Sequence, residues 1–193
     1  MQLPFLTVFI FCFSQLVSAQ DLEALSLQEQ GYNAFVVVDN LDYTPFEEGL
    51  KSNHPEEAHQ KLVDTIHAIY DELFPDFSRT KLLNSINLNI ARFYFRHNDF
   101  GFAKTYFLKV LDSPDPIFPY TKSLETSERN AICLNLARIF IKEENYASAT
   151  LYLNKSKKYH VEQECGNGMV DDQKRLQELY DICESGMANK KRP

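Results

Sequence analysis

The strongest constraint on the fold is an internal duplication in the middle of the chain. When residues 84–112 are laid over residues 130–158, nine of the 29 positions are identical, well above chance. Self-similarity at a fixed offset indicates a repeat architecture, in which one supersecondary unit stacks on a copy of itself. The identical pairs, 46 residues apart, are Asn84/Asn130, Ile86/Ile132, Leu88/Leu134, Asn89/Asn135, Ala91/Ala137, Arg92/Arg138, Ala103/Ala149, Tyr106/Tyr152 and Lys109/Lys155.

Each copy contains two apolar segments with helical spacing, and a short polar break separates them. The break is residues 97–99 in the first copy and residues 143–145 in the second. Asn adopts the left-handed conformation that ends a helix, and Asp or Asn caps the helix that follows. Because the break is so short, the two helices of each copy are predicted to run antiparallel.

Small residues stand at matched heights on the two helices of each copy. Ala91 and Ala103 are twelve residues apart, as are Ala137 and Ala149. Such residues let two helices approach to the close end of the usual range of about 8–10 Å between axes. We therefore expect tight helix pairs whose remaining gaps are filled by the surrounding aromatic side chains.

This pattern resembles the tetratricopeptide repeat (TPR) family. Asn87 and Cys133 stand where that family has its opening Trp, and the offset of 46 residues exceeds the usual repeat of about 34 because of residues 114–126. The resemblance implies an all-α fold, a TPR-like α-solenoid of antiparallel helix hairpins with a capping C-terminal helix. The matching residues are Ile90, Ala91, Tyr94, Phe100, Ala103, Phe107 and Pro114 in the first copy, and Leu136, Ala137, Phe140, Tyr146, Ala149 and Leu153 in the second.

The flanking segments give the domain organisation. Residues 54–74 and residues 169–185 both have amphipathic helical spacing, and the second segment suits a capping helix. The residues expected to face inward are Leu62, Val63, Ile66, Ile69, Tyr70 and Leu73 in the first segment, and Val170, Leu176, Leu179, Tyr180 and Ile182 in the second. Residues 35–42 are the one β-like run, which predicts a short strand or an extended segment lying on the helices. We therefore expect a signal peptide at 1–19, an acidic and partly extended leader at 20–53, a TPR-like helical domain at 54–187 and a basic tail at 188–193.

The first residues look like a targeting segment. Residues 3–13 are nearly all apolar, and Val17, Ser18 and Ala19 form a small-residue ending typical of signal cleavage. We expect a secreted or periplasmic protein with no stable membrane span after cleavage. An uncleaved anchor or an N-terminal core helix would be the alternatives.

The cysteines of the cleaved chain cannot all pair in disulfides. Cleavage after Ala19 would leave Cys133, Cys165 and Cys183, an odd number. Cys133 is expected to be a buried thiol. A disulfide between Cys165 and Cys183 stays an alternative. Geometry weighs against it, because Cys183 lies about 21 Å along a helix that begins near Met169, whereas the four residues before that helix reach back only about 13 Å.

Charge is divided unevenly along the chain. The full chain has a net charge of −7, which argues against a dedicated nucleic-acid binder. Residues 20–78 hold 13 acidic and 2 basic residues, a net −11, whereas residues 79–193 hold 14 acidic and 18 basic residues, a net +4. One hypothesis is that the acidic leader, residues 20–51, lies in a basic groove of its own chain and acts as a latch. A solvated acidic face is the alternative.

The TPR resemblance implies that the first helices of the hairpins line a groove that holds a peptide. Each copy places a base, an apolar residue and a base on one stripe, which would attract an acidic segment. The expected partner is another protein or peptide that is acidic or amphipathic. We do not expect the chain to bind nucleic acid. The predicted groove residues are Leu88, Arg92, Phe95 and Arg96, then Leu134, Arg138, Ile141 and Lys142.

No catalytic motif stands out, and no enzyme activity, cofactor or metal is predicted. His59 and His67 are eight residues apart but have no third ligand between them, whereas a metal site needs three or four. His160, Cys165 and Cys183 are only a weak candidate for a metal site. The alternative functions are the sensory module of a signalling system and a helical-repeat enzyme of unknown reaction.

Overall fold

The computed structural model describes residues 19–52, 55–119, 124–159 and 168–190, and within these ranges it contains helices and no strand. The predicted all-α fold class is therefore confirmed. The signal peptide predicted at 1–19 lies almost entirely outside the described residues. The helices are α1 (Ala19–Asp39), α2 (Thr44–Leu50), α3 (Pro55–Leu73), α4 (Arg79–Arg96), α5 (Phe100–Asp112), α6 (Glu125–Lys142), α7 (Tyr146–Lys158) and α8 (Gly168–Lys190).

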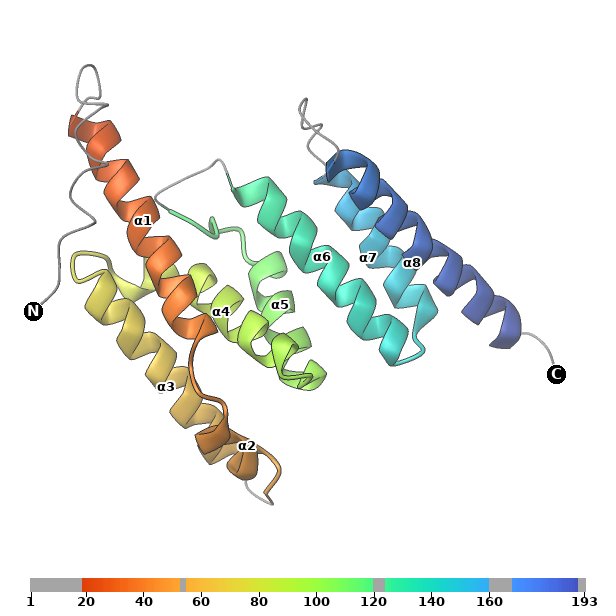
Figure 1. The fold of residues 1–193 in the computed structure, drawn as a ribbon, viewed down its shortest axis with the longest axis horizontal. Helices are drawn as coiled ribbons and strands as arrows, with labels where there is room; N and C mark the ends of the chain where they lie inside the picture. The colour runs from red at the N-terminus through yellow and green to blue at the C-terminus, as the bar shows by residue number, and fades with distance from the viewer. Residues whose placement is uncertain (1–18, 53–54, 120–123, 160–167, 191–193) are drawn as a thin grey trace, which may run out of the picture.

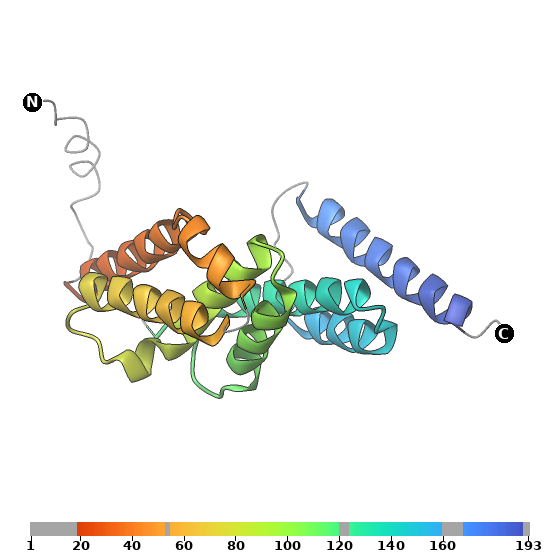
Figure 2. The ribbon, with the colours of Figure 1, turned by 90° about the horizontal axis from the view of Figure 1, so that it is seen from below.

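The helices form an elongated stack of hairpins (Figures 1 and 2). The pairs α4–α5 and α6–α7 are the two duplicated units, and they meet where α5 contacts α6. At one end α3 packs on α4, with α1 lying on both, and at the other end α8 packs on α7 and α6. The expected capping position of the last helix is thus observed. None of the described helices combines the length and apolar character that crossing a bilayer requires.

Both hairpins turn through the same backbone geometry. Asn98 and Glu144 have positive φ angles of 60° and 54°. The amide that follows each of them donates back across the turn, from Asp99 to the Tyr94 carbonyl at 3.0 Å and from Asn145 to the Phe140 carbonyl at 2.8 Å. This is the hydrogen-bond pattern that closes a helix through one left-handed residue. The duplication therefore preserves the turn even though the residues in it differ.

The Asn145 side chain then starts α7, accepting a hydrogen bond from the Ser148 amide at 3.2 Å. The structure thus confirms the predicted antiparallel pairing and the predicted cap in the second copy. Asp99 stands at the corresponding position in the first copy and makes no such side-chain bond.

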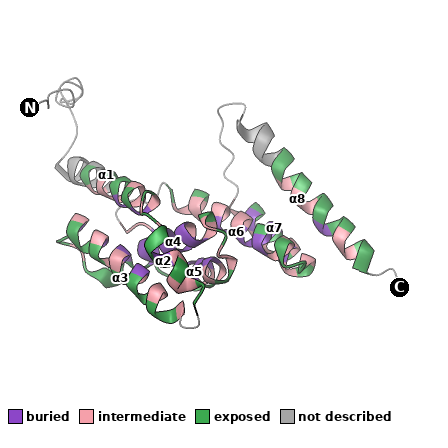
Figure 3. Cartoon of the chain, turned by 60° about the horizontal axis from the view of Figure 1, so that its bottom comes forward, coloured by how far each residue is buried: buried purple, intermediate pink, exposed green. Residues whose placement is uncertain are grey.

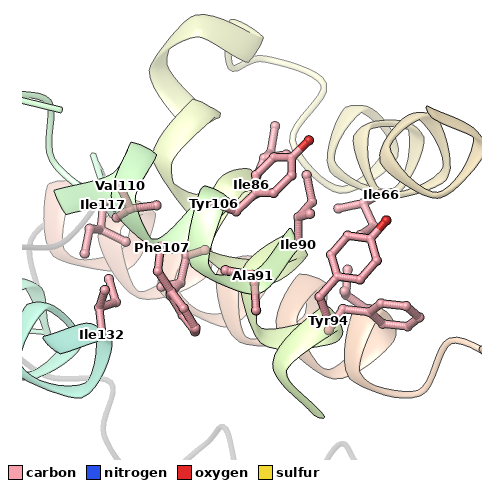
Figure 4. Packing of buried hydrophobic residues seen from close by; sticks show 14 of the residues in the cluster. Ile66, Ile86, Ile90, Ala91, Tyr94, Tyr106, Phe107, Val110, Ile117 and Ile132 are labelled. Atoms are coloured by element: carbon pink, nitrogen blue, oxygen red, sulfur yellow. The ribbon is translucent and has the colours of Figure 1, made fainter. Parts of the chain in front are cut away.

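The paired alanines lie where the helices of each hairpin meet. Ala91, Ala103, Ala137 and Ala149 are completely buried. In the first hairpin Ala91 lies among the side chains of Ile90, Tyr94 and Phe107 (Figure 4). The small side chains permit close approach, and the rings fill the space on either side, as the spacing predicted.

The predicted extended leader is wrong for residues 35–39, which complete α1. Ala34 and Val38, four residues apart and both buried, share a core with the rest of the stack, as does Phe46 of α2. Burial of this one face outweighs the preference of Val36 and Val37 for strands, because tertiary packing overrides intrinsic propensity. The leader is therefore part of the helical stack.

The segment between the two copies is held against α4. Asn84 donates from Nδ2 to the Asp115 carbonyl at 2.8 Å and to the Ser113 hydroxyl at 3.0 Å. Ser85 donates to the carbonyl of Ile117, whose side chain is buried. These bonds explain why Asn84 and Ser85, two polar residues, can be buried in the core.

The flanking helices run close to their predicted bounds, but α8 continues five residues beyond 185, into the predicted basic tail. Leu62, Ile66 and Tyr70 of α3 are buried, as its stripe predicted. Ile182, expected to face inward, is 47% exposed. Its neighbour Cys183 takes the buried position. Figure 3 shows the contrast between the mostly buried α4 and the largely exposed outer faces of α3 and α8.

Candidate functional site

A basic stripe occurs twice, once on each first helix of a hairpin. On α6, Asn135, Arg138 and Lys142 follow one another at spacings of three and four residues. This spacing places side chains on one face of a helix. On α4 the same register is occupied by Asn89, Arg92 and Arg96.

The two cations of the first copy are paired within the chain. Arg92 donates to Glu128 of α6, and both side chains are largely buried, at 28% and 19% exposed. The Arg92 guanidinium also lies 5.0 Å from the ring centroid of Phe35 on α1. Arg96 forms an ion pair with Asp39 at the end of α1. Little positive charge is left on this part of the predicted groove.

The two cations of the second copy have no acidic partner among the side chains that the structure describes. Arg138 donates from Nη1 to Asn135 of its own helix at 3.2 Å, and it is exposed. The Lys142 ammonium lies 4.7 Å from the ring centroid of Phe100 on α5. The duplicated stripe therefore keeps its charge in the second copy only.

These two cations border an open depression of about 370 Å³ at the junction of α4, α5, α6 and α8. We call it the Arg138 depression. It joins charge with apolar surface, a combination suited to an amphipathic segment. It is lined by Phe95, Asn98, Phe100, Arg138, Ile141, Lys142 and Leu179.

The structure brings together four of the eight predicted groove residues, namely Phe95, Arg138, Ile141 and Lys142. Arg92 and Arg96 do not line the Arg138 depression and are paired with Glu128 and Asp39.

Leu88 does not face an open groove, so its prediction as a groove residue is wrong, and Leu134 does not line the Arg138 depression. Leu88 is only 1% exposed, because α4 is enclosed by α1, α3 and α5. Leu134 is half-buried and packs with Ala137, Leu153 and Cys183 beneath α8.

Sequence reasoning missed the contribution of α8. Leu179 was recognised as part of an inward stripe, but nothing tied it to the groove because α8 has no counterpart in the repeat. Arg175, four residues earlier, and Ile182, three residues later, lie on the same side of the helix. Both are exposed, but Leu179 is the residue of α8 that lines the Arg138 depression.

A second polar cluster ties α3 to the first hairpin. His59 lies 2.7 Å from the Tyr94 hydroxyl through Nδ1 and 3.1 Å from the Tyr106 hydroxyl through Nε2. Its ring also stacks on Phe102 at 4.3 Å. Burial lowers the pKa of His59, and the nearby cation of Lys109 adds to this effect. Both ring nitrogens are thus engaged in packing helices together.

His67, the other histidine of this helix, has a buried Nδ1 with no hydrogen-bond partner among the residues that the structure describes. Desolvation lowers its pKa as well.

The structure also locates the thiols and the candidate metal ligands. Cys133 and Cys183 are buried free thiols, and burial raises the pKa of Cys133 to about 11. His160 and Cys165 of the predicted trio lie outside the described residues. Within the described ranges, no three His, Cys, Asp or Glu side chains are grouped so as to hold a metal ion.

Comparisons of the chain with family models, with curated proteins and with solved structures found no match.

Proposed function

We propose that the chain is a non-catalytic protein-interaction module of the TPR type, which binds an acidic segment of a partner protein in the Arg138 depression. The observation that carries this proposal is the pair Arg138 and Lys142. They border an open depression, and no described carboxylate pairs with them. The equivalent cations of the first copy both have such a partner.

The surroundings of the pair favour an amphipathic acidic segment. Phe95, Ile141 and Leu179 supply apolar surface from three different helices. Carboxylates of the partner would accept hydrogen bonds from Arg138, which offers two parallel donors, and from Lys142. The apolar side chains between those acids would cover the hydrophobic floor. Electrostatic attraction of this kind raises the association rate and makes binding sensitive to salt.

The test is fluorescence anisotropy with a labelled peptide of alternating Glu and Leu. Arg138→Glu together with Lys142→Glu should weaken binding at least tenfold, because two attractive contacts become repulsive. Lys81→Glu is the matched control, since Lys81 is exposed on α4 and belongs to neither stripe. An equal loss from Lys81→Glu, or no loss from the double variant, would refute the proposed site.

Export is a further part of the proposal. The support is the apolar run with its small-residue ending at Ala19. Since α1 begins at Ala19, cleavage there would leave nearly the whole helix intact. N-terminal sequencing of the chain from a secreting host should give Gln20 as the first residue. A chain that retains Met1 in the cytoplasmic fraction would contradict export.

A further inference from the structure

A second hollow lies between α1, α3, α4 and the start of α6, and both α4 and α6 also line the Arg138 depression. Its volume is about 310 Å³, close to the lower end of ligand cavities, which fits a single ring system. We call it the aromatic cavity. Four rings and one leucine supply its apolar lining, from Tyr32, Phe35, Tyr70, Phe118 and Leu124.

Three polar side chains of the aromatic cavity, Arg92, Glu128 and Asn89, have partners within the chain. Arg92 and Glu128, which both line it, are paired with each other. Asn89, also in the lining, donates to the Tyr70 hydroxyl at 2.6 Å. An anionic ligand would have to compete with Glu128 for Arg92, and a cationic ligand would have to compete with Arg92. The cavity therefore favours a neutral occupant.

Ring faces favour an aromatic occupant, which can stack or pack edge-to-face against them. Tyr32 and Leu124 are 65% and 41% exposed, so covering them would bury apolar surface that water now contacts. We propose that the aromatic cavity holds a Trp, Phe or Tyr side chain of the same partner segment whose acids bind at the Arg138 depression. This inference depends on the proposed function.

The spacing of the two sites follows from α6, which lines both. Glu128 borders the aromatic cavity and Arg138 borders the depression. Ten helical residues span about 15 Å. An extended peptide covers about 3.3–3.6 Å per residue, so the aromatic residue and the acids should be separated by about four or five residues. The partner motif is therefore bipartite, with an aromatic anchor and an acidic pair at a fixed separation.

The experiment measures binding of peptides that carry one Trp and two adjacent Glu separated by one, four or ten Gly/Ser residues. The peptide with four intervening residues should bind best, and replacing its Trp by Ala should weaken its binding about tenfold, in the range of an interface anchor. When the Tyr32→Ala variant is used, replacing the Trp of the peptide by Ala should change the affinity little. Leu83→Ala, which removes an exposed side chain of α4 outside the cavity, should behave like the unmodified chain.

The outcomes separate the two proposals. Binding that depends on Arg138 and Lys142 but ignores both the Trp and its spacing would overturn the aromatic anchor and leave the proposed function standing. Binding that depends on the Trp but ignores the acids would overturn the proposed function. Free indole should compete with the Trp peptide. If indole binds while the peptide Trp has no effect, the cavity is a small-molecule site and the anchor is refuted.

Discussion

Nδ1 of His59 on α3 lies 2.7 Å from the hydroxyl oxygen of Tyr94 on α4. The opposite ring nitrogen reaches Tyr106 on α5 at 3.1 Å. One imidazole thus connects three helices and joins the N-terminal part of the stack to the first hairpin. Because the ring is partly desolvated, the charged form of His59 is disfavoured in the folded chain.

Stability should therefore depend on pH in a defined direction. The pKa of His59 is lowered from 6.5 by burial and by Lys109, and Asp99 offsets this only in part. Below pH 6.5 the unfolded chain consequently binds more protons than the folded chain, so the free energy of unfolding should fall as the pH drops. Urea unfolding followed by circular dichroism at about pH 7.5 and about pH 5.5 measures this change.

His59→Gln is the control for this prediction. It should reduce the pH dependence without abolishing it, because the pKa values of His67 and His97 are also lowered by burial. A variant whose pH dependence equals that of the unmodified chain would show that His59 does not contribute.

The alanine positions provide a test of the helix packing. Ala149 is completely buried between α6 and α7 and Ala147 of the same helix is exposed. Ala149→Leu should lower the free energy of unfolding by about 1–3 kcal/mol through overpacking. Ala147→Leu should change it by less than about 0.5 kcal/mol. Chemical denaturation compares the two variants, and equal effects would mean that Ala149 is not a close-packing position.

The ion pair between Asp39 and Arg96 offers a sharper test of the latch hypothesis than deletion of the leader, since α1 and α2 contribute to the core. Asp39→Asn should release Arg96 and raise the affinity for an acidic peptide by up to about fivefold, the upper range for exposed pairs. Anisotropy measures the affinity.

Adding Arg96→Gln to Asp39→Asn should return the affinity to its original value. A gain in affinity that persists in this double variant would exclude Arg96 as its cause.

The thiols should be unreactive in the folded chain. Cys133 and Cys183 are buried, and burial raises the pKa of both. In a chain carrying Cys12→Ser and Cys165→Ser, a thiol reagent at about pH 8 should label neither residue until denaturant is added, because the thiolate is the reactive form. Rapid labelling of one thiol under native conditions would indicate that α6 or α8 opens locally.

The features that the sequence predicted well are local ones. Ala91 and Ala103, with the break around Asn98, specify a helix hairpin through spacing alone, and the second copy repeats that specification. Helix α1 could not be predicted in this way, because its helical state depends on burying Ala34 and Val38 against distant helices. The Val residues between them favour a strand when they are read alone.

The same difference between local features and distant contacts explains why the candidate site was predicted only in part. Alignment of the copies identified Arg138 and Lys142, since register on a helix follows from sequence. It could not show that Arg92 is paired with Glu128, which lies 36 residues away, or that Leu88 is buried on α4, on which α1 packs from the start of the chain. Both differences arise from long-range packing, which breaks the equivalence of the two copies.

The bonds from Asn84 and Ser85 to residues 113–117 bear on how this repeat can vary in length. Shortening the connection toward the common spacing of about 34 residues would leave those buried polar atoms unpaired, at about 1–3 kcal/mol for each. Deletions in this connection should therefore survive only alongside apolar replacements at positions 84 and 85. Homologues that have lost the insertion are expected to carry Ala, Val or Leu there, a covariation visible in sequence before any of their structures is determined.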